Sequence, residues 1–364
     1  MNKPNNKKTN GFLGKSIYES GIIKRDEFWY ILKDLLDWNK LAEELNELFK
    51  NQSTGASNYP PVIMLKILFI QRMYNASDRS VSEMCTQTIK LKYFLGLEIQ
   101  EEGPDYSTIS KFRTSIIKRY GDEYFKGLFD GILTTIKSLG ISIGSSYVVD
   151  STITYANVNP FKDDKRVEEG KERRDADASW TAKSRPGKDD TGENVTRKNW
   201  YYGYKTHTLV DNRDLITSLI TDTASKHDDV YTNDLIKQNI EKEFDIKELT
   251  GDKAYGQNLV NINILEKEYG IFTGFIVKKS SYTKGELEDR IHWQDYNTDP
   301  RRDNLRKTRS GIEKVFADLK QNHGLGRAKY IGKKKYAMQS FLSAICHNLK
   351  RAIVLLFGIS FHIS

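Results

Sequence analysis

Two aspartates lie within or directly after apolar segments, where an ionised carboxylate is energetically costly without a partner. Asp150 follows the apolar residues 147–149, and a carboxylate inside such a strand is costly unless it is hydrogen-bonded, paired or bound to a metal. Asp252 comes directly after Gly251, at the end of a second apolar segment. Aspartates at strand ends are common catalytic positions in open sheets, and capping of a turn is the ordinary alternative for Asp252. Both residues are therefore candidate catalytic or metal-binding carboxylates.

A glutamate and two cations share one helical run. Glu313 opens the run 312–320, Arg309 lies four positions before it, and Lys320 lies seven positions after it. Residues at these spacings project from one side of a helix, which places a carboxylate between two cations. A solvent-exposed ladder of salt bridges is the alternative interpretation of this pattern.

Positive charge is concentrated around this run. The chain carries 57 Lys and Arg against 49 Asp and Glu, a formal net charge of +8. Between residues 321 and 351 there are basic residues and no acidic ones, and just upstream five basic residues in 301–309 are opposed only by Asp303. Because these tracts flank the candidate chemistry, they favour a nucleic acid as partner, with a solvated face as the alternative.

Composition excludes several protein classes. The 364 residues suffice for two domains, and a hydrophobic fraction of 38% is enough for a core. No stretch of 18 consecutive apolar residues is present, so we expect no membrane span. The first 16 residues contain no apolar segment of a secretory signal. The only cysteines, Cys85 and Cys346, exclude a disulfide scaffold and a Cys-based zinc site, and together these features predict a cytoplasmic protein.

The N-terminal part is predicted to be helical. Residues 1–15 have the composition of a disordered tail, and 26–51 show an amphipathic helical pattern. Three further helices are expected at 61–74, at 80–94 with a capping box at Ser80 and Glu83, and from about Ser107. This unit resembles a helix-turn-helix, and its third helix carries Lys111, Arg113, Lys118 and Arg119. DNA contact by that helix and a plain packing or dimerisation domain remain open alternatives.

The remainder is predicted to be a mixed sheet with helices, in the α+β (mixed α/β) class. Strands are expected at 146–153, 200–210, 215–221, 246–250 and 272–277, and helices at 228–242, 259–269, 310–322 and 337–357. The polar stretch 162–199 is too long for a simple loop, and we expect an inserted flap that is partly ordered at best without its ligand. Trp180 within it either stacks on a nucleic-acid base or anchors the flap to the core.

Taken together, these segments resemble a known family. Asp150 in Val-Val-Asp-Ser-Thr, Asp252 in Gly-Asp-Lys-Ala-Tyr, and the spacing of Arg309, Glu313 and Lys320 are similar to the three blocks of the DDE transposases of bacterial insertion sequences, in the group of families four and five. Arg306 stands where that group has a tyrosine that handles the DNA end. Further similarities lie at 104–113, 203–207 and 225–228, so that the resemblance covers residues 55–351.

The resemblance implies an RNase H-like catalytic domain at 141–364, with an insertion at about 157–199, after a helical DNA-binding or dimerisation domain at 16–140. In such a fold the first and fourth strands are neighbours, so Asp150 and Asp252 would face each other, with the Glu313 helix at that edge. Three carboxylates suit Mg²⁺ or Mn²⁺, in a pair of ions. The basic residues that the resemblance assigns to DNA are Arg309, Lys320, Lys205 and Arg306.

The implied function is a transposase that cleaves double-stranded DNA at the inverted-repeat ends of its element and transfers the strands into target DNA. A homodimer on DNA is implied, in the bacterial cytoplasm and at the nucleoid when bound. The alternatives are a nuclease that cuts without joining and a transposase-derived DNA-binding protein that no longer cleaves. A plain helix-turn-helix regulator leaves the three acidic blocks unexplained.

Overall fold

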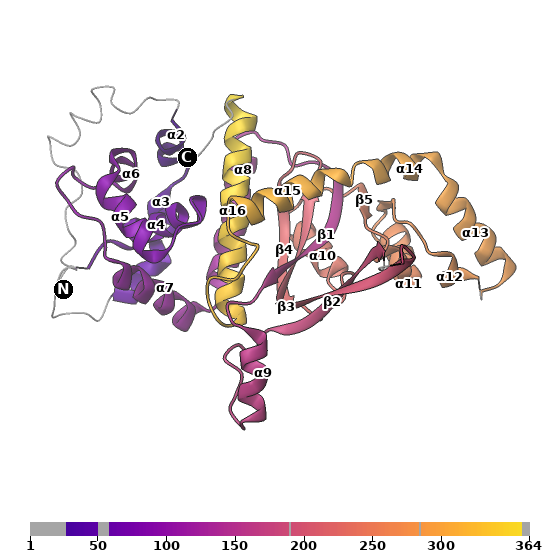
Figure 1. Cartoon of the computed structure of the whole chain (residues 1–364). Helices are drawn as coiled ribbons and strands as arrows, with labels where there is room; N and C mark the ends of the chain where they lie inside the picture. The colour runs from indigo at the N-terminus through magenta and orange to yellow at the C-terminus, as the bar shows by residue number, and fades with distance from the viewer. Residues whose placement is uncertain (1–26, 50–57, 189–190, 284, 359–364) are drawn as a thin grey trace. The chain divides into compact units, whose positions relative to one another are not determined.

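The chain folds into two compact units (Figure 1). The computed structural model describes residues 27–49, 58–188, 191–283 and 285–358, so the expected tail at 1–15 lies outside the described residues. The first unit comprises residues up to Ile141 together with those from Phe341 onward, and the second comprises Ser142–Ser340. The expected domain boundary at 140/141 lies one residue away, whereas residues from Phe341 onward, assigned above to the catalytic domain, group with the first unit.

The first unit is helical throughout its described part. It contains α2 (Phe28–Leu35), α3 (Trp38–Leu41), the 3₁₀ helix η2 (Glu43–Phe49), α4 (Pro61–Met73), α5 (Asp78–Gln87), α6 (Ile89–Leu95), α7 (Tyr106–Tyr120), α8 (Glu123–Ser138) and the C-terminal part of α16 (Lys333–Phe357). Proline opens α4, where its missing N–H costs nothing, and α4 is buried along almost its whole length. Both cysteines are buried, and they form no disulfide with each other.

Three details of the expected helices are wrong. The single helix at 26–51 is broken, because Leu36 is extended and Asp37 caps a new helix by accepting the Lys40 N–H. The cap of the next helix is Ser77, whose side chain accepts the Ser80 N–H, so Ser80 lies inside α5. That helix then ends at Thr88, which is extended, before α6 begins. Helix α8 was not expected at all.

A buried ion pair joins α5 and α7. Arg113 is only 4% exposed and donates two hydrogen bonds to the Asp78 carboxylate, at 2.9 and 2.7 Å. Burial acts to raise the pKa of Asp78, but the hydrogen bonds and charge of Arg113 lower it below its ordinary value. Of the four cations noted on this helix, Arg113 is therefore a structural residue, while Lys111, Lys118 and Arg119 are exposed.

The second unit is built on a six-stranded mixed sheet. Its strands are β1 (Ser146–Tyr155), β2 (Ser179–Lys188), β3 (Asn194–Asp211), β4 (Ile216–Thr223), β5 (Glu248–Gly251) and β6 (Phe272–Thr273). The last half of β3 lies between β4 and β1, antiparallel to both, and β5 and β6 continue parallel to β1. Strand β2 belongs to the insertion. Without it, β5 is the fourth strand in chain order, and it lies beside the first strand, β1, as expected for this fold. The expected α+β class with an RNase H-like arrangement is thus confirmed.

Helices pack on this sheet and continue beyond it. They are α9 (Pro160–Glu168), α10 (Thr232–Glu241), η3 (Tyr255–Gln257), α11 (Leu259–Lys267), α12 (Lys279–Tyr282), α13 (Leu287–Thr298), α14 (Pro300–Lys307) and α15 (Ser310–Gln321). Side chains of β1, β3 and β5 form one hydrophobic core with α10, α11 and α13, around Tyr147, Val149 and Leu249. The segment 278–309, expected to be a polar loop, instead forms three helices.

The expectation of a partly ordered flap is wrong for its described part. Residues 179–188 pair with 194–203 in an unbroken antiparallel register, so β2 and the first half of β3 form a long hairpin (Figure 1). Helix α9 precedes it, with proline in its first turn and Asn159 accepting the Lys162 N–H. Most residues of the hairpin beyond Ala182 are exposed on both faces, so the strands show no alternation of polar and apolar residues.

Among the described residues, α16 alone is long and apolar enough to cross a membrane by length and composition. In its most apolar window 67% is buried inside the protein. A helix in a protein core passes the same test, so this is weak evidence for a span.

Candidate active site

Asp150 and Asp252 extend from neighbouring strands at the same level. The last pair of the parallel β1–β5 register is Val149 with Gly251, and each aspartate is the next residue along the chain. Burial, followed by the charges of Asp252 and Asp228, raises the pKa of Asp150 to about 6. The Ser151 N–H, which donates to Asp150 Oδ1 at 2.7 Å, and Arg309 act in the opposite direction. Negative charge therefore accumulates at this edge of the sheet.

The turn after β5 fixes Asp252. Its Oδ1 accepts the Ala254 N–H at 2.7 Å, so the capping role suggested by the sequence is present. At Gly251 a Cβ would lie 2.9 Å from both the Val149 carbonyl oxygen and the Tyr255 ring, so only glycine fits there. The Tyr255 hydroxyl is buried without a hydrogen-bond partner in the described structure, and its pKa is raised by burial and by Asp150, Asp228 and Asp252.

A third aspartate, Asp228, joins this cluster, although the sequence analysis did not single it out as a site residue. It accepts hydrogen bonds from Ser151 Oγ at 2.5 Å and from Lys205 Nζ at 2.8 Å. Burial alone would raise the pKa of Asp228. The hydrogen bonds from Lys205 and Ser151, together with the charge of Lys205, outweigh burial, so that the pKa lies below its ordinary value. Its segment, 225–228, is one of the further similarities to the family given above. Its closeness to Asp150 is a consequence of the strand pairing.

The structure corrects the expected role of Lys205. Its side chain is 7% exposed, and its ammonium donates to Asp228 and to the Lys226 carbonyl oxygen at 2.6 Å. A phosphate could reach it only if these contacts were broken. Lys205 instead neutralises the charge of Asp228 within the protein.

Replacing Lys205 by methionine is expected to lower the free energy of unfolding by about 3 kcal/mol, because breaking a largely buried pair leaves Asp228 uncompensated. Urea denaturation near neutral pH measures this change. The matched control is the exposed Lys226→Met, for which we expect a change of at most about 0.5 kcal/mol. A Lys205→Met protein as stable as the control would contradict the structural role.

Helix α15 brings its cations, but not its glutamate, to the aspartates. Arg309 lies 3.9 Å from Asp150 Oδ2. Partial desolvation and the charge of Lys183 lower the pKa of Lys320, while Asp150 acts to raise it. Glu313 is exposed in the first turn and makes no hydrogen bond or ion pair with the described residues. Accordingly, no group of three or more His, Cys, Asp or Glu side chains in the described ranges is close enough to hold a metal.

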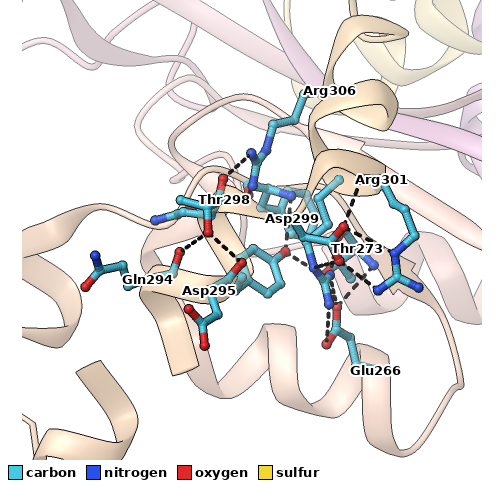
Figure 2. A network of polar contacts seen from close by, with 12 residues as sticks. Glu266, Thr273, Gln294, Asp295, Thr298, Asp299, Arg301 and Arg306 are labelled. Atoms are coloured by element: carbon cyan, nitrogen blue, oxygen red, sulfur yellow. Dashed lines mark hydrogen bonds and ion pairs between the residues drawn. The ribbon is translucent and has the colours of Figure 1, made fainter. Parts of the chain in front are cut away.

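The structure also corrects the expected role of Arg306. Its guanidinium donates to the carbonyl oxygens of Asn297, at 2.8 Å, and Phe275, at 3.0 Å. Figure 2 shows it above a network that includes Asp299, Thr273 and Glu266. In this network Arg302 donates to the Thr273 carbonyl oxygen at 2.5 Å and pairs with Glu266. Arg306 thus joins α14 to the end of α13 and to the segment after β6, while Arg302 joins α14 to β6 itself. Helix α14 leads directly to Arg309 and the helix of Glu313.

Comparisons with known proteins agree with this architecture. Residues 147–349 match a family model described as "Transposase DDE domain", and residues 18–115 match one described as "Transposase domain (DUF772)". No solved structure matches the chain. The first match covers more than half of the chain and includes all three acidic blocks. The chain therefore belongs to the DDE transposases of insertion-sequence type.

Proposed function

We propose that this transposase cleaves DNA at the inverted-repeat ends of its own element and joins the freed 3′-hydroxyl to target DNA, with Asp150, Asp252 and Glu313 as its catalytic carboxylates. The observation that carries the proposal is the position of Asp150 and Asp252, each of which directly follows a member of the last register pair of two parallel strands, Val149 and Gly251. Burial and, after it, the charge of Asp252 raise the pKa of Asp150, so a bound cation would stabilise the ionised carboxylates at this edge.

The family normally uses a divalent metal. Asp150 and Asp252 supply two carboxylates for such an ion, and Glu313 would have to move toward them to complete the set, because no group of three candidate ligands is assembled in the described residues. Carboxylate oxygens are the ligands preferred by Mg²⁺ and Mn²⁺. Asp150, Asp252 and Glu313 would hold the ions, in a pair. Such ions, when bound, activate a water or a 3′-hydroxyl and stabilise the leaving oxygen of an in-line displacement. Arg309 and Lys320 bind the DNA phosphates beside the carboxylates, and Lys205 keeps Asp228 paired behind them.

Double-stranded DNA is the substrate at both stages, as element end and as target. A homodimer is proposed because two ends of one element are held together during transposition. The site of action is the bacterial cytoplasm, at the nucleoid. Because Glu313 is separated from the two aspartates, a second candidate function is a transposase-derived DNA-binding protein that no longer cleaves.

Labelled duplexes that carry the DNA flanking the gene, incubated with the protein in Mg²⁺, Mn²⁺ or EDTA, test this proposal. We expect metal-dependent cleavage at a repeat boundary, followed by joining of the 3′ end to a second duplex. Glu313→Gln is expected to bind the duplex and not cleave it, whereas the exposed Glu288→Gln on α13 retains cleavage. Tight binding with no cleavage in any metal would favour the binding-only descendant. Cleavage without joining would favour the nuclease.

A further inference from the structure

An aromatic groove lies at the base of the β2–β3 hairpin, away from the acidic cluster. Its volume is about 620 Å³, within the roughly 300–1,000 Å³ typical of ligand sites. We name as the aromatic groove the hollow lined by Tyr155, Phe161, Trp180, Trp200, Tyr202 and Arg327. These residues come from the end of β1, the first turn of α9, the paired strands β2 and β3, and the segment after α15. Neither the catalytic chemistry nor the fold explains so many aromatic side chains here.

The groove has a fixed floor and an exposed rim. Trp180 and Tyr202 are direct partners across the hairpin, with ring centroids 5.3 Å apart, and the Tyr202 hydroxyl donates to the Asp175 carbonyl oxygen at 2.8 Å. Around them, Phe161 is 72% exposed, Trp200 61% and Tyr155 48%. Large aromatic side chains exposed together around one concavity are typical of a binding surface, because solvating them is unfavourable.

The charge next to the groove indicates what binds there. The paired segments of the hairpin beyond the groove carry five exposed cations and no acidic residue within 179–188 and 194–203: Lys183, Arg185, Lys188, Arg197 and Lys198. Arg185 and Arg197 are direct partners across the two strands, although like charges placed opposite each other are destabilising. A polyanion removes this repulsion. Aromatic faces beside cations form the combination that binds unpaired nucleotides.

The groove also has a defined position relative to the candidate catalytic residues. Thr208 is the partner of Asp150 on β3, and Tyr202 lies six residues along the same strand, on the same face. At ~3.4 Å per residue this separation is about 20 Å. At the ~3.4 Å rise per nucleotide of duplex DNA, this separation corresponds to about six nucleotides. A strand whose phosphate lies at Asp150 thus has the length to reach the groove.

We propose that the aromatic groove binds unpaired nucleobases of the DNA strand, stacked against Trp200 and Phe161 and several nucleotides from the cleaved phosphate, while the hairpin cations hold the backbone. The inference deepens the proposed function, since it names how that DNA is held.

The test measures binding of an oligothymidylate and of a duplex of the same length by full-length protein in EDTA, using fluorescence anisotropy. Trp200→Ala and Phe161→Ala are each expected to weaken binding of the oligothymidylate about 10-fold and to leave duplex binding within about 2-fold. Arg185→Gln is expected to weaken both and to reduce the salt dependence. The control is Leu287→Ala on α13, which is 68% exposed and remote from the hairpin in sequence, and it changes neither.

Unchanged binding of the oligothymidylate by both aromatic variants would overturn the proposal, and so would an equal loss for both DNAs. Either result would assign the groove to a protein partner or to a second copy of the chain. Because EDTA prevents metal-dependent cleavage, this outcome is independent of the cleavage assay. Loss of cleavage with selective oligothymidylate binding intact would reject the proposed function alone.

Discussion

Replacing Asp150 by asparagine is expected to reduce metal-dependent cleavage by on the order of 1,000-fold or more, because asparagine keeps the shape of the side chain but not the charge that binds a cation. Binding of the same duplex in EDTA is expected to stay within about 2-fold, since the DNA-binding cations are unchanged. Initial rates of duplex cleavage in Mg²⁺ and anisotropy in EDTA provide the two measurements.

The same substitution is expected not to destabilise the protein. The pKa of Asp150 is about 6 in the fold against 3.8 ordinarily, so the fold disfavours the ionised form, and that cost is fully present above about pH 6. At pH 8 in EDTA the variant should therefore unfold at the same temperature as the native chain, or at a higher one. Asp303→Asn, on the surface of α14 with its side chain 61% exposed, is the matched control and keeps full cleavage. Equal loss of cleavage in both variants, or a lower unfolding temperature for Asp150→Asn, would contradict this account.

Replacing Asp78 by asparagine is expected to lower the stability of the helical unit by about 3–5 kcal/mol. The reason is that Arg113, 4% exposed, stays charged and loses its carboxylate partner. Urea denaturation near neutral pH, followed by circular dichroism, measures this effect. The exposed pair Lys247–Asp245 provides the control, since Asp245→Asn should cost at most about 0.5 kcal/mol.

The effect of Asp78→Asn has a defined pH dependence. The pKa of Asp78 is lowered in the fold, so its contribution to stability is present above its ordinary pKa of about 4 and is lost as the pH falls through the folded value. The difference between the native chain and Asp78→Asn should therefore shrink in acid. A difference that is small at neutral pH, or that grows in acid, would show that the pair does not stabilise α5 against α7.

The two aspartates of the site could be identified from the sequence because their signals are local. Asp150 interrupts an apolar strand, and Asp252 follows a glycine at the end of another, so each is visible in a window of a few residues. Their adjacency followed from the resemblance, and the parallel register of β1 with β5 confirms it. Arg309 also lies close to Asp150, at the edge where the resemblance placed its helix.

The partners of the cations could not be predicted, because they depend on contacts between distant segments. Lys205 meets Asp228 across 23 positions of sequence, and Arg306 meets the Phe275 carbonyl oxygen across 31. In the sequence each of these residues is only a basic residue near a motif. The same holds for Arg113, whose partner lies 35 positions away on another helix.

Two errors in secondary structure have a different origin. The β2–β3 hairpin is exposed over most of its length, so it lacks the alternation that identifies a half-buried strand. Helix α8 did carry a signal that was overlooked. Its buried residues, among them Phe125, Leu128, Phe129 and Ile132, follow the three- and four-residue spacing of an amphipathic helix.

The most direct test of the central claim, that Asp150 and Asp252 bind the catalytic metal, is the ratio of cleavage rates in Mn²⁺ and Mg²⁺ for Asp150→Cys and Asp252→Cys. Mg²⁺ prefers hard oxygen ligands, whereas Mn²⁺ accepts a thiolate more readily. We expect both variants to be inactive in Mg²⁺ and at least one to regain cleavage in Mn²⁺, with the ratio raised by about 10-fold or more over that of the native chain. An unchanged ratio, or no cleavage by either variant in either metal, would contradict the claim.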